Sequence, residues 1–153
     1  MPDHLNTVFY GVSDTQTFYR GIQMALGASI SGQVFTGDNL FTFGKSLGFL
    51  ADRQFMSIFN AQATETAEQA TVWRAHTLCW AARRALPLDG DFVECGSYRG
   101  TSARILVEAL AFEKTGKRFS MFDVFDDVGQ IDQHDYPALK GGIHDFVRSR
   151  FAD

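Results

Sequence analysis

The sequence contains no run of apolar residues long enough to cross a membrane. Its longest uninterrupted apolar run is five residues, Leu78 to Ala82, whereas a transmembrane helix needs about twenty. The N-terminus has neither a basic region nor an apolar stretch behind it. We therefore see no secretory signal and expect a cytoplasmic protein. Proline is scarce, at 3 of 153 residues. Because repeats and low-complexity stretches are also missing, we expect neither a disordered nor a collagen-like chain.

Basic clusters and cysteine-rich motifs are missing as well. The chain has 14 Lys and Arg against 18 Asp and Glu, a net charge of −4, and a nucleic-acid-binding surface is normally basic. The pair Arg83-Arg84 is better explained by an interaction with the dipole at the end of a helix. Cys79 and Cys95 show no zinc-ligand spacing and lie in apolar segments. We therefore expect no nucleic-acid partner, no metal site and two reduced, buried thiols.

Apolar residues make up 45% of the chain, and 21 residues are aromatic, 15 of them Phe. This is enough for a hydrophobic core in a chain of about one domain. Before residue 90 the pattern is helical with loops between the helices. We expect a helix at 14–26 capped by Asp14 and ended by Gly27, a loop at 28–38, and short helices at 40–50 and 53–60, the second capped by Asp52.

A clearer helix follows at about 66–86. Thr66 and Gln69 match a capping box, and apolar residues recur at helical spacing from Val72 to Leu86. The pattern predicts about five helical turns. His76 lies beside the apolar face, and we expect it to be a packed residue rather than a base or a metal ligand.

After residue 90 the pattern changes to strand, loop, helix and strand. We expect a strand at 91–95, a glycine-bracketed loop at 96–100, a helix at 101–114, a second strand at 118–123 and a last helix at about 142–151. The helix at 101–114 is apolar around most of its circumference, as expected for a helix that packs on a sheet. This order predicts an α/β fold with parallel strands.

Four residues of this unit suggest a nucleotide site. Glu94 ends the first strand, Gly96 and Gly100 bracket the loop, and Asp123 ends the second strand. Nucleotides bind at the carboxyl ends of parallel strands. Gly96 lets the backbone turn and approach a ligand, and a carboxylate after the second strand can accept both ribose hydroxyls. The glycine spacing by itself is explained equally well by an ordinary strand-to-helix turn.

The loop also selects among ligands. A P-loop needs Gly-Lys-Ser/Thr, but Gly100 is followed by Thr101-Ser102. A dinucleotide fingerprint needs a second glycine where this chain has Tyr98, and that ring would crowd a pyrophosphate at the helix N-terminus. The loop therefore favours an adenosine cofactor without phosphates, of which S-adenosylmethionine is the common one.

Residues 91–100 (DFVECGSYRG) resemble the first cofactor motif of the macrocin O-methyltransferase-like family, which are class I S-adenosylmethionine-dependent methyltransferases. Residues 122–125 (FDVF) resemble the second motif of that family. The resemblance to its N-terminal helical cap involves residues 38–40, 44–50 and 73–76. The whole resemblance spans about 38–126, and the chain has Asp126-Asp127 where the family often has Glu-Gly.

The resemblance implies a Rossmann-like class I methyltransferase fold of which the chain holds the first two parallel strands. Residues 63–153 would form this part of the cofactor-binding domain, and residues 1–62 would form an α-helical cap. The later strands of the family fold, with its acceptor pocket, metal ligands and general base, are missing here. Because parallel sheets need both faces covered, we expect marginal stability or a homo-oligomer.

The resemblance also implies cofactor-binding residues: Glu94, Gly96, Tyr98, Gly100, Ser102 and Asp123. Asp123 would hold the ribose, Tyr98 and Ser102 would contribute less, and a helix-cap role explains Ser102 equally well. Members of the family methylate sugar hydroxyls on natural products or glycans, and some use a divalent metal. We therefore expect an S-adenosylmethionine-dependent O-methyltransferase with a small-molecule or glycan acceptor. No base is assigned, because surface roles are better explanations for His134 and His144.

Two other functions remain open from the sequence. The first is a truncated, non-catalytic cofactor-binding or interaction module, which the missing later strands favour. The second is a nicotinamide-dependent oxidoreductase, against which Tyr98 in the glycine loop argues.

Overall fold

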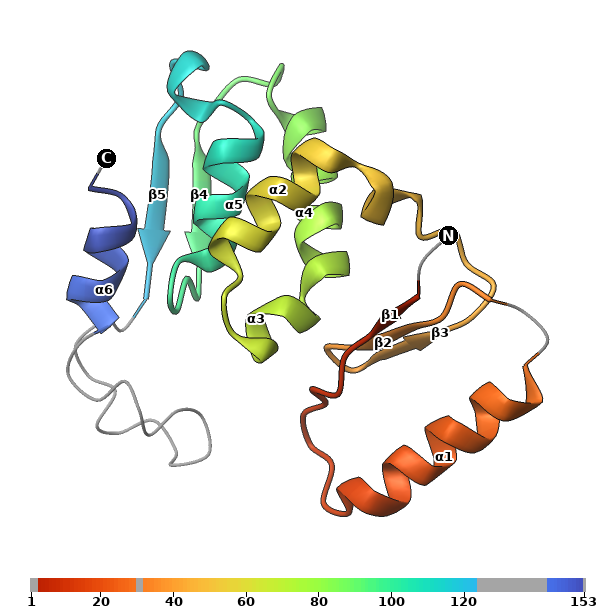
Figure 1. Ribbon diagram of the computed structural model, residues 1–153. Helices are drawn as coiled ribbons and strands as arrows, with labels where there is room; N and C mark the ends of the chain where they lie inside the picture. Colours follow the sequence, from red (N-terminus) through yellow and green to blue (C-terminus); the bar gives the residue numbers. More distant parts are fainter. Residues whose placement is uncertain (1–2, 30–31, 124–142, 153) are drawn as a thin grey trace. The chain divides into compact units, whose positions relative to one another are not determined.

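The structure is a computed structural model that describes residues 3–29, 32–123 and 143–152. The chain forms two compact units, Met1–His76 and Thr77–Asp153, and the boundary between them falls within helix α4 (Val72–Ala85) (Figure 1). Both units mix helices with short strands, so the fold is of the mixed α/β kind. None of the described helices is long and apolar enough to span a membrane.

The first unit has a three-stranded sheet besides its helices. Its elements before α4 are β1 (His4–Leu5), α1 (Thr15–Ala28), β2 (Phe35–Gly37), β3 (Leu40–Thr42), the 3-10 helix η1 (Gly48–Ala51), α2 (Arg53–Gln62) and α3 (Thr66–Ala70). The strand order is β1-β2-β3, with β1 parallel and β3 antiparallel to β2. Asp38 and Asn39 both have positive φ between β2 and β3, which is typical of the tight turn of a β-hairpin.

Several predicted elements of this unit are confirmed. The Asp14 carboxylate accepts a hydrogen bond from Thr17 N at 3.0 Å and caps α1, which ends one residue beyond the expected Gly27. The Asp52 carboxylate caps α2 in the same way, through Phe55 N at 3.0 Å. In both cases the cap satisfies an amide at the helix N-terminus that has no partner within the helix.

The sheet corrects two predictions and shows that residues 1–62 are not purely helical. The segment 28–38 is not only a loop, because it contains β2, and the helix expected at 40–50 is wrong, because β3 and η1 occupy that segment. Long-range pairing explains the first error, because Phe35 of β2 pairs with His4 across 31 positions of the chain and such pairing leaves no local periodic pattern. β3 pairs with β2 through the hairpin, from Phe35↔Thr42 to Gly37↔Leu40.

The helix expected at 66–86 is divided into α3 and α4. The capping box lies one residue earlier than predicted, because Glu65 and Glu68 form it and not Thr66 and Gln69. Thr71 separates the two helices, and its hydroxyl donates to Glu68 O at 2.6 Å. A threonine hydroxyl that bonds to a preceding carbonyl competes with the helical hydrogen bonds.

The core of the first unit is aromatic. His76 stacks on Phe49, with ring centroids 4.7 Å apart, and meets Phe55 edge-on at 5.5 Å. His76 is therefore a packed residue, as predicted. The largest fully buried side chains of this unit are Phe35, Phe55, Phe59, Leu47 and Val72.

The second unit has the predicted strand–loop–helix–strand order. After α4 its elements are β4 (Phe92–Cys95), α5 (Thr101–Ala109), the 3-10 helix η2 (Phe112–Lys114), β5 (Phe119–Phe122) and α6 (Ile143–Arg150) (Figure 1). β4 and β5 are parallel and paired from Phe92↔Phe119 to Cys95↔Phe122. Both strands, the loop and α6 are confirmed, and Arg83 and Arg84 lie in the last turn of α4 as expected.

The helix predicted at 101–114 is shorter than expected. It ends at Ala109, and Ala111 adopts a left-handed conformation with φ of 47° before η2 begins. This turn directs the Phe112 ring into the core, where it meets Phe92 and Phe119 edge-on, with centroids at 5.4 and 5.6 Å. Leu106 of α5 and Ala82 of α4 complete the buried cluster.

The opposite face of the β4–β5 sheet is exposed. Val93 is 63% and Phe122 59% exposed, and Cys95 on the same face is exposed as well, which corrects the prediction of two buried thiols. Cys79 is buried, and burial raises the pKa of its thiol against the opposing charge of Arg83. An uncovered parallel sheet is unusual, so self-association of the chain stays a prediction that sedimentation can test.

Candidate functional site

The carboxyl ends of β4 and β5 lie next to each other because the two strands are parallel and in register. Cys95, the last residue of β4, pairs with Phe122, the last residue of β5. The next residue, Gly96, donates from its N–H to Phe122 O at 2.8 Å. The loop at 96–100 therefore begins where β5 ends, and this is the edge at which open parallel sheets bind ligands.

The backbone of this loop turns sharply through positive φ angles. They are 80° at Gly96, 45° at Tyr98 and 70° at Gly100, and Gly100 N donates to Ser97 O at 2.8 Å. Tyr98 is notable because a residue with a side chain rarely adopts this conformation. No described atom lies within 4 Å of the point where Gly96 would carry a Cβ, so this part of the loop is open to a ligand.

Helix α5 begins directly at the end of the loop. Its N-cap residue is Gly100, which has no side chain with which to cap the helix. The helix-cap explanation for Ser102 is therefore wrong, since Ser102 lies in the first turn and not at the cap. The amides of a first helical turn have no partner within the helix, and here they face the same edge of the sheet as the loop.

Asp123 follows β5 and contacts the loop. Its carboxylate accepts a hydrogen bond from Tyr98 N, although the residue itself is exposed. This bond joins the end of the second strand to the middle of the loop. A carboxylate has about four acceptor positions, so it can accept hydrogen bonds from more than one donor at the same time.

Glu94 lies beneath the loop, half-buried, on the face of β4 that also carries Phe92. Burial raises the pKa of its carboxyl above the ordinary 4.5, the nearby Ser97 hydroxyl opposes this rise, and the charge of Asp123 adds to it. Glu94 Oε2 and Ser97 Oγ are both buried, and the Ser97 hydroxyl is close enough to act on the Glu94 carboxyl but does not make a hydrogen bond of good geometry to Oε2. A buried acceptor of this kind needs a donor, because leaving it unpaired costs free energy.

Sequence reasoning did not select Ser97 as a site residue. Ser97 is only 6% exposed and lies between Gly96 and Tyr98 in the loop. Its position in the loop between Gly96 and Gly100 is the sequence signal that could have identified it, and that signal is not specific. The structure adds it to the candidate site because its hydroxyl lies close enough to Glu94 to affect the carboxyl pKa.

The raised pKa of Glu94 predicts a pH-dependent cost in stability. Between pH 4.5 and the raised pKa, the folded chain binds more protons at Glu94 than the unfolded chain, so stability falls as the pH rises through this window. The Glu94→Gln variant has no such group. We expect it to gain stability relative to the natural chain between pH 4.5 and 7, measured by urea denaturation at several pH values.

The difference in stability between these two chains does not depend on the other titrating groups, because both chains contain them. Burial lowers the pKa of His4, which gives the opposite trend below pH 6.5, but His4 is present in both chains and its effect cancels. A stability difference that does not change with pH would contradict the predicted shift at Glu94.

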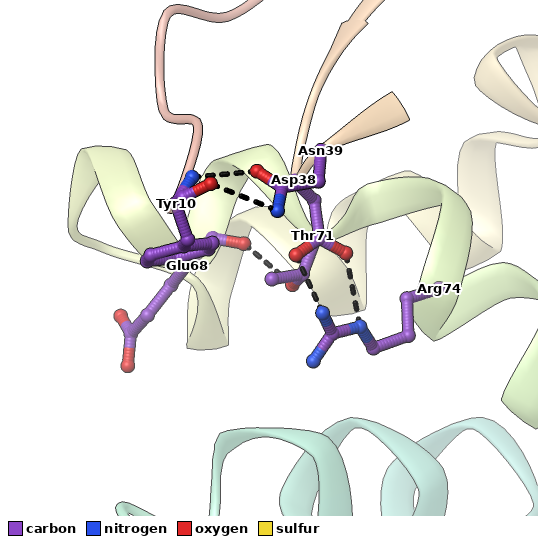
Figure 2. A network of polar contacts seen from close by, with 6 residues as sticks. All are labelled: Tyr10, Asp38, Asn39, Glu68, Thr71 and Arg74. Carbon is purple, nitrogen blue, oxygen red and sulfur yellow. Dashed lines mark hydrogen bonds and ion pairs between the residues drawn. The ribbon is translucent and has the colours of Figure 1, made fainter. Parts of the chain in front are cut away.

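Residues of the three segments 38–40, 44–50 and 73–76 contact one another in the first unit. The Arg74 guanidinium pairs with Asp38 through two hydrogen bonds of 2.9 and 2.5 Å (Figure 2). Asn39 receives a bond from Tyr10 N at 2.5 Å and donates to Tyr10 O at 3.1 Å. Phe49 completes the cluster, with its ring 5.3 Å from that of Trp73. These residues hold the hairpin turn, the N-terminal segment and the start of α4 together.

All six predicted cofactor-binding residues lie in the described part of the chain. Residues 124 and 125 of the second motif, Asp126, Asp127 and His134 lie outside the described residues, as does the side chain of His144. The described part of the chain contains no group of three or more His, Cys, Asp or Glu side chains that could hold a metal ion.

The arrangement combines an open glycine turn, the N-terminus of a helix, a half-buried carboxylate and an exposed carboxylate at one edge of a parallel pair of strands. Such a set can accept hydrogen bonds from hydroxyl and amine groups of a small ligand and donate to its acceptors. It brings together Glu94, Gly96, Tyr98, Gly100 and Asp123, with Ser102 in the adjoining helical turn. The chain matches no protein-family model, no curated protein and no solved structure.

Proposed function

We propose that the chain binds S-adenosylmethionine at the carboxyl ends of β4 and β5 and serves as an O-methyltransferase for a sugar or another small-molecule hydroxyl. The observation that carries the proposal is the hydrogen bond between the Asp123 carboxylate and Tyr98 N, because it joins the two predicted cofactor motifs at one edge of the sheet. The resemblance of residues 91–100 and 122–125 to the macrocin O-methyltransferase-like family supports the same site.

The residues present fit this cofactor. Glu94 Oε2 is a buried acceptor that needs a donor, and the cofactor carries an amine and two ribose hydroxyls. The space around Gly96 is open, so the backbone can approach the ligand without a side chain in the way. The loop contains Tyr98 where a pyrophosphate site would need glycine, which favours a ligand without phosphates.

Each residue has a distinct role in this proposal. Asp123 accepts hydrogen bonds from the ribose hydroxyls, Glu94 accepts from a donor group of the ligand, and the loop amides position the ligand at the start of α5. When bound, S-adenosylmethionine supplies a methyl group on a sulfonium, which an acceptor hydroxyl can attack. The contribution of this chain is to bind and orient the ligand.

Calorimetric titration with S-adenosylhomocysteine tests the proposal directly. We expect saturable binding close to one ligand per chain. A parallel titration with NADH is expected to give no binding, because Tyr98 crowds a pyrophosphate. A folded chain that binds NADH and not S-adenosylhomocysteine would replace the proposal with a nicotinamide site, and a folded chain that binds neither would overturn it.

Asp123 should contribute measurably to affinity. We expect Asp123→Ala to raise the Kd for S-adenosylhomocysteine roughly tenfold or more, because it removes hydrogen bonds to a charged group. Asp123→Asn keeps an acceptor for Tyr98 N and is expected to have a smaller effect. Titration calorimetry measures both variants.

Asp89→Ala is the matched control for charge. Asp89 is also exposed, but it precedes β4 and so lies at the opposite end of the strand from the site. We expect the affinity of the Asp89→Ala variant for S-adenosylhomocysteine to equal that of the natural chain. An unchanged Kd for Asp123→Ala would remove Asp123 from the site.

A further inference from the structure

Helix α6 lies directly against the last residue of the glycine loop. A Cβ added at Gly100 would be 3.3 Å from Phe151 Cε2 and 3.5 Å from Val147 Cγ1. Val147 is 5% exposed, and Gly100 is buried. The contact is therefore between the bare backbone of the loop and the apolar face of α6, at the point where α5 begins.

Two arginines from the loop and from α5 extend this contact. The Arg99 guanidinium lies over the Phe146 ring, 4.6 Å from its centroid, and the Arg104 guanidinium lies 5.6 Å from the centroid of Phe151. Arg150 of α6 is also placed over the Phe146 ring, at 4.9 Å. Cations within about 6 Å of a ring centroid are attracted by the negative face of the ring. The Phe146 ring of α6 and the Phe151 ring that follows it therefore hold α6 to the glycine loop and α5.

The loop needs such support because its backbone is strained. Tyr98 has a left-handed φ of 45°, flanked by positive φ at Gly96 and Gly100. A non-glycine residue in this conformation costs about 1–2 kcal/mol and persists only when its surroundings hold it there. The bond from Tyr98 N to Asp123 holds one side of the loop, and the contacts of Arg99 and Gly100 with α6 hold the other.

We propose that α6 is a clamp that keeps the loop at 96–100 in its binding shape, and that Arg99 is a positioning residue that acts through the face of the Phe146 ring. The effect on ligand affinity rests on the proposed function, but the effect on loop rigidity does not. α6 comes from a part of the chain that neither cofactor motif includes, so the clamp adds a third segment to the site.

The test is a double-mutant cycle on the full chain with Arg99→Leu and Phe146→Leu. Hydrogen exchange of the amides at 96–102, in the absence of ligand, reports the rigidity of the loop. Loss of this one half-buried cation–π contact is expected to speed exchange about two- to fivefold. The double variant should be no faster than the faster single variant, because both substitutions remove the same contact.

Three further variants separate positioning from general packing. Arg99→Lys keeps a cation and Phe146→Trp keeps an aromatic face, so both should restore exchange to nearly the natural rate. Arg148→Leu removes an exposed arginine of the same helix and should leave exchange unchanged. Additive effects in the cycle, failure of the two conservative variants to restore slow exchange, or an equal effect of Arg148→Leu would overturn the proposal.

Affinity for S-adenosylhomocysteine gives the second readout. We expect the Kd to rise about two- to fivefold in Arg99→Leu and Phe146→Leu, in parallel with the faster exchange. If the natural chain binds the ligand and the variants exchange faster with an unchanged Kd, Arg99 is not a positioning residue. If the natural chain does not bind, the proposed function fails, and the exchange cycle alone decides whether α6 clamps the loop.

Discussion

Replacing Phe112 by alanine is expected to unfold the second unit. Phe112 is 6% exposed and is the ring that both strands share, since it meets Phe92 and Phe119 edge-on. Truncation of a buried Phe to Ala costs about 3–5 kcal/mol through lost transfer free energy and the cavity left behind. A core of this size rarely supplies more than about 3–5 kcal/mol. The loss is therefore comparable with the whole stability of the unit.

Urea denaturation followed by circular dichroism, with hydrogen exchange over residues 92–122, measures this effect. Phe122→Ala is the matched control, because it makes the same substitution on β5 at a side chain that is 59% exposed. We expect the control to lose less than about 1 kcal/mol. Similar losses for the two variants would mean that Phe112 does not organise the core of the second unit.

The position of Phe112 in the core could be predicted only in part from the sequence. The apolar pattern correctly predicted that the segment 101–114 packs on a sheet. It did not predict the left-handed turn at Ala111 that ends α5 early and directs Phe112 into the core. Alanine strongly favours a continuous helix, so we attribute the turn to a tertiary contact, the packing of Phe112 against Phe92 and Phe119.

Local signals predicted the helices that depend on local contacts. Asp14 and Asp52 were identified as caps because a cap bonds to an amide only three residues away. Strands β1 and β2 of the first unit were missed, because they pair with each other across about thirty residues. No cap or other local contact marks β4 and β5. They were predicted because each is a short apolar run next to a glycine turn or loop.

The part of the candidate site that lies at the ends of β4 and β5 was predictable, because it follows from the parallel arrangement of the strands. Parallel strands bring their carboxyl ends to one edge, so Glu94, the glycine loop and Asp123 had to be neighbours once the strands were assigned. The clamp on the loop was not predictable. Contacts of Arg99 with Phe146 and of Gly100 with Phe151 join segments about fifty residues apart, and no periodic pattern links them.

Replacing Gly100 by valine is expected to have the second large effect. Gly100 has a φ of 70°, and a β-branched residue is a strong outlier in this conformation. The backbone cost is about 1–2 kcal/mol. The new side chain would also press on Phe151 and Val147, which already lie 3.3 and 3.5 Å from the Cβ position, and overpacking adds about 1–3 kcal/mol. We expect a total loss of about 2–5 kcal/mol, measured by urea denaturation.

The variant Gly116→Val separates the backbone cost of valine from the cost of overpacking. Gly116 also has a φ of 70°, but no described atom lies within 4 Å of its Cβ position, so valine there incurs only the backbone cost. The difference between the two variants therefore measures the contact between the loop and α6. We expect Gly100→Val to speed hydrogen exchange at both 96–102 and 145–151, because displacing α6 frees both sides of the contact. Equal losses of stability in the two variants would show that α6 does not press on the loop.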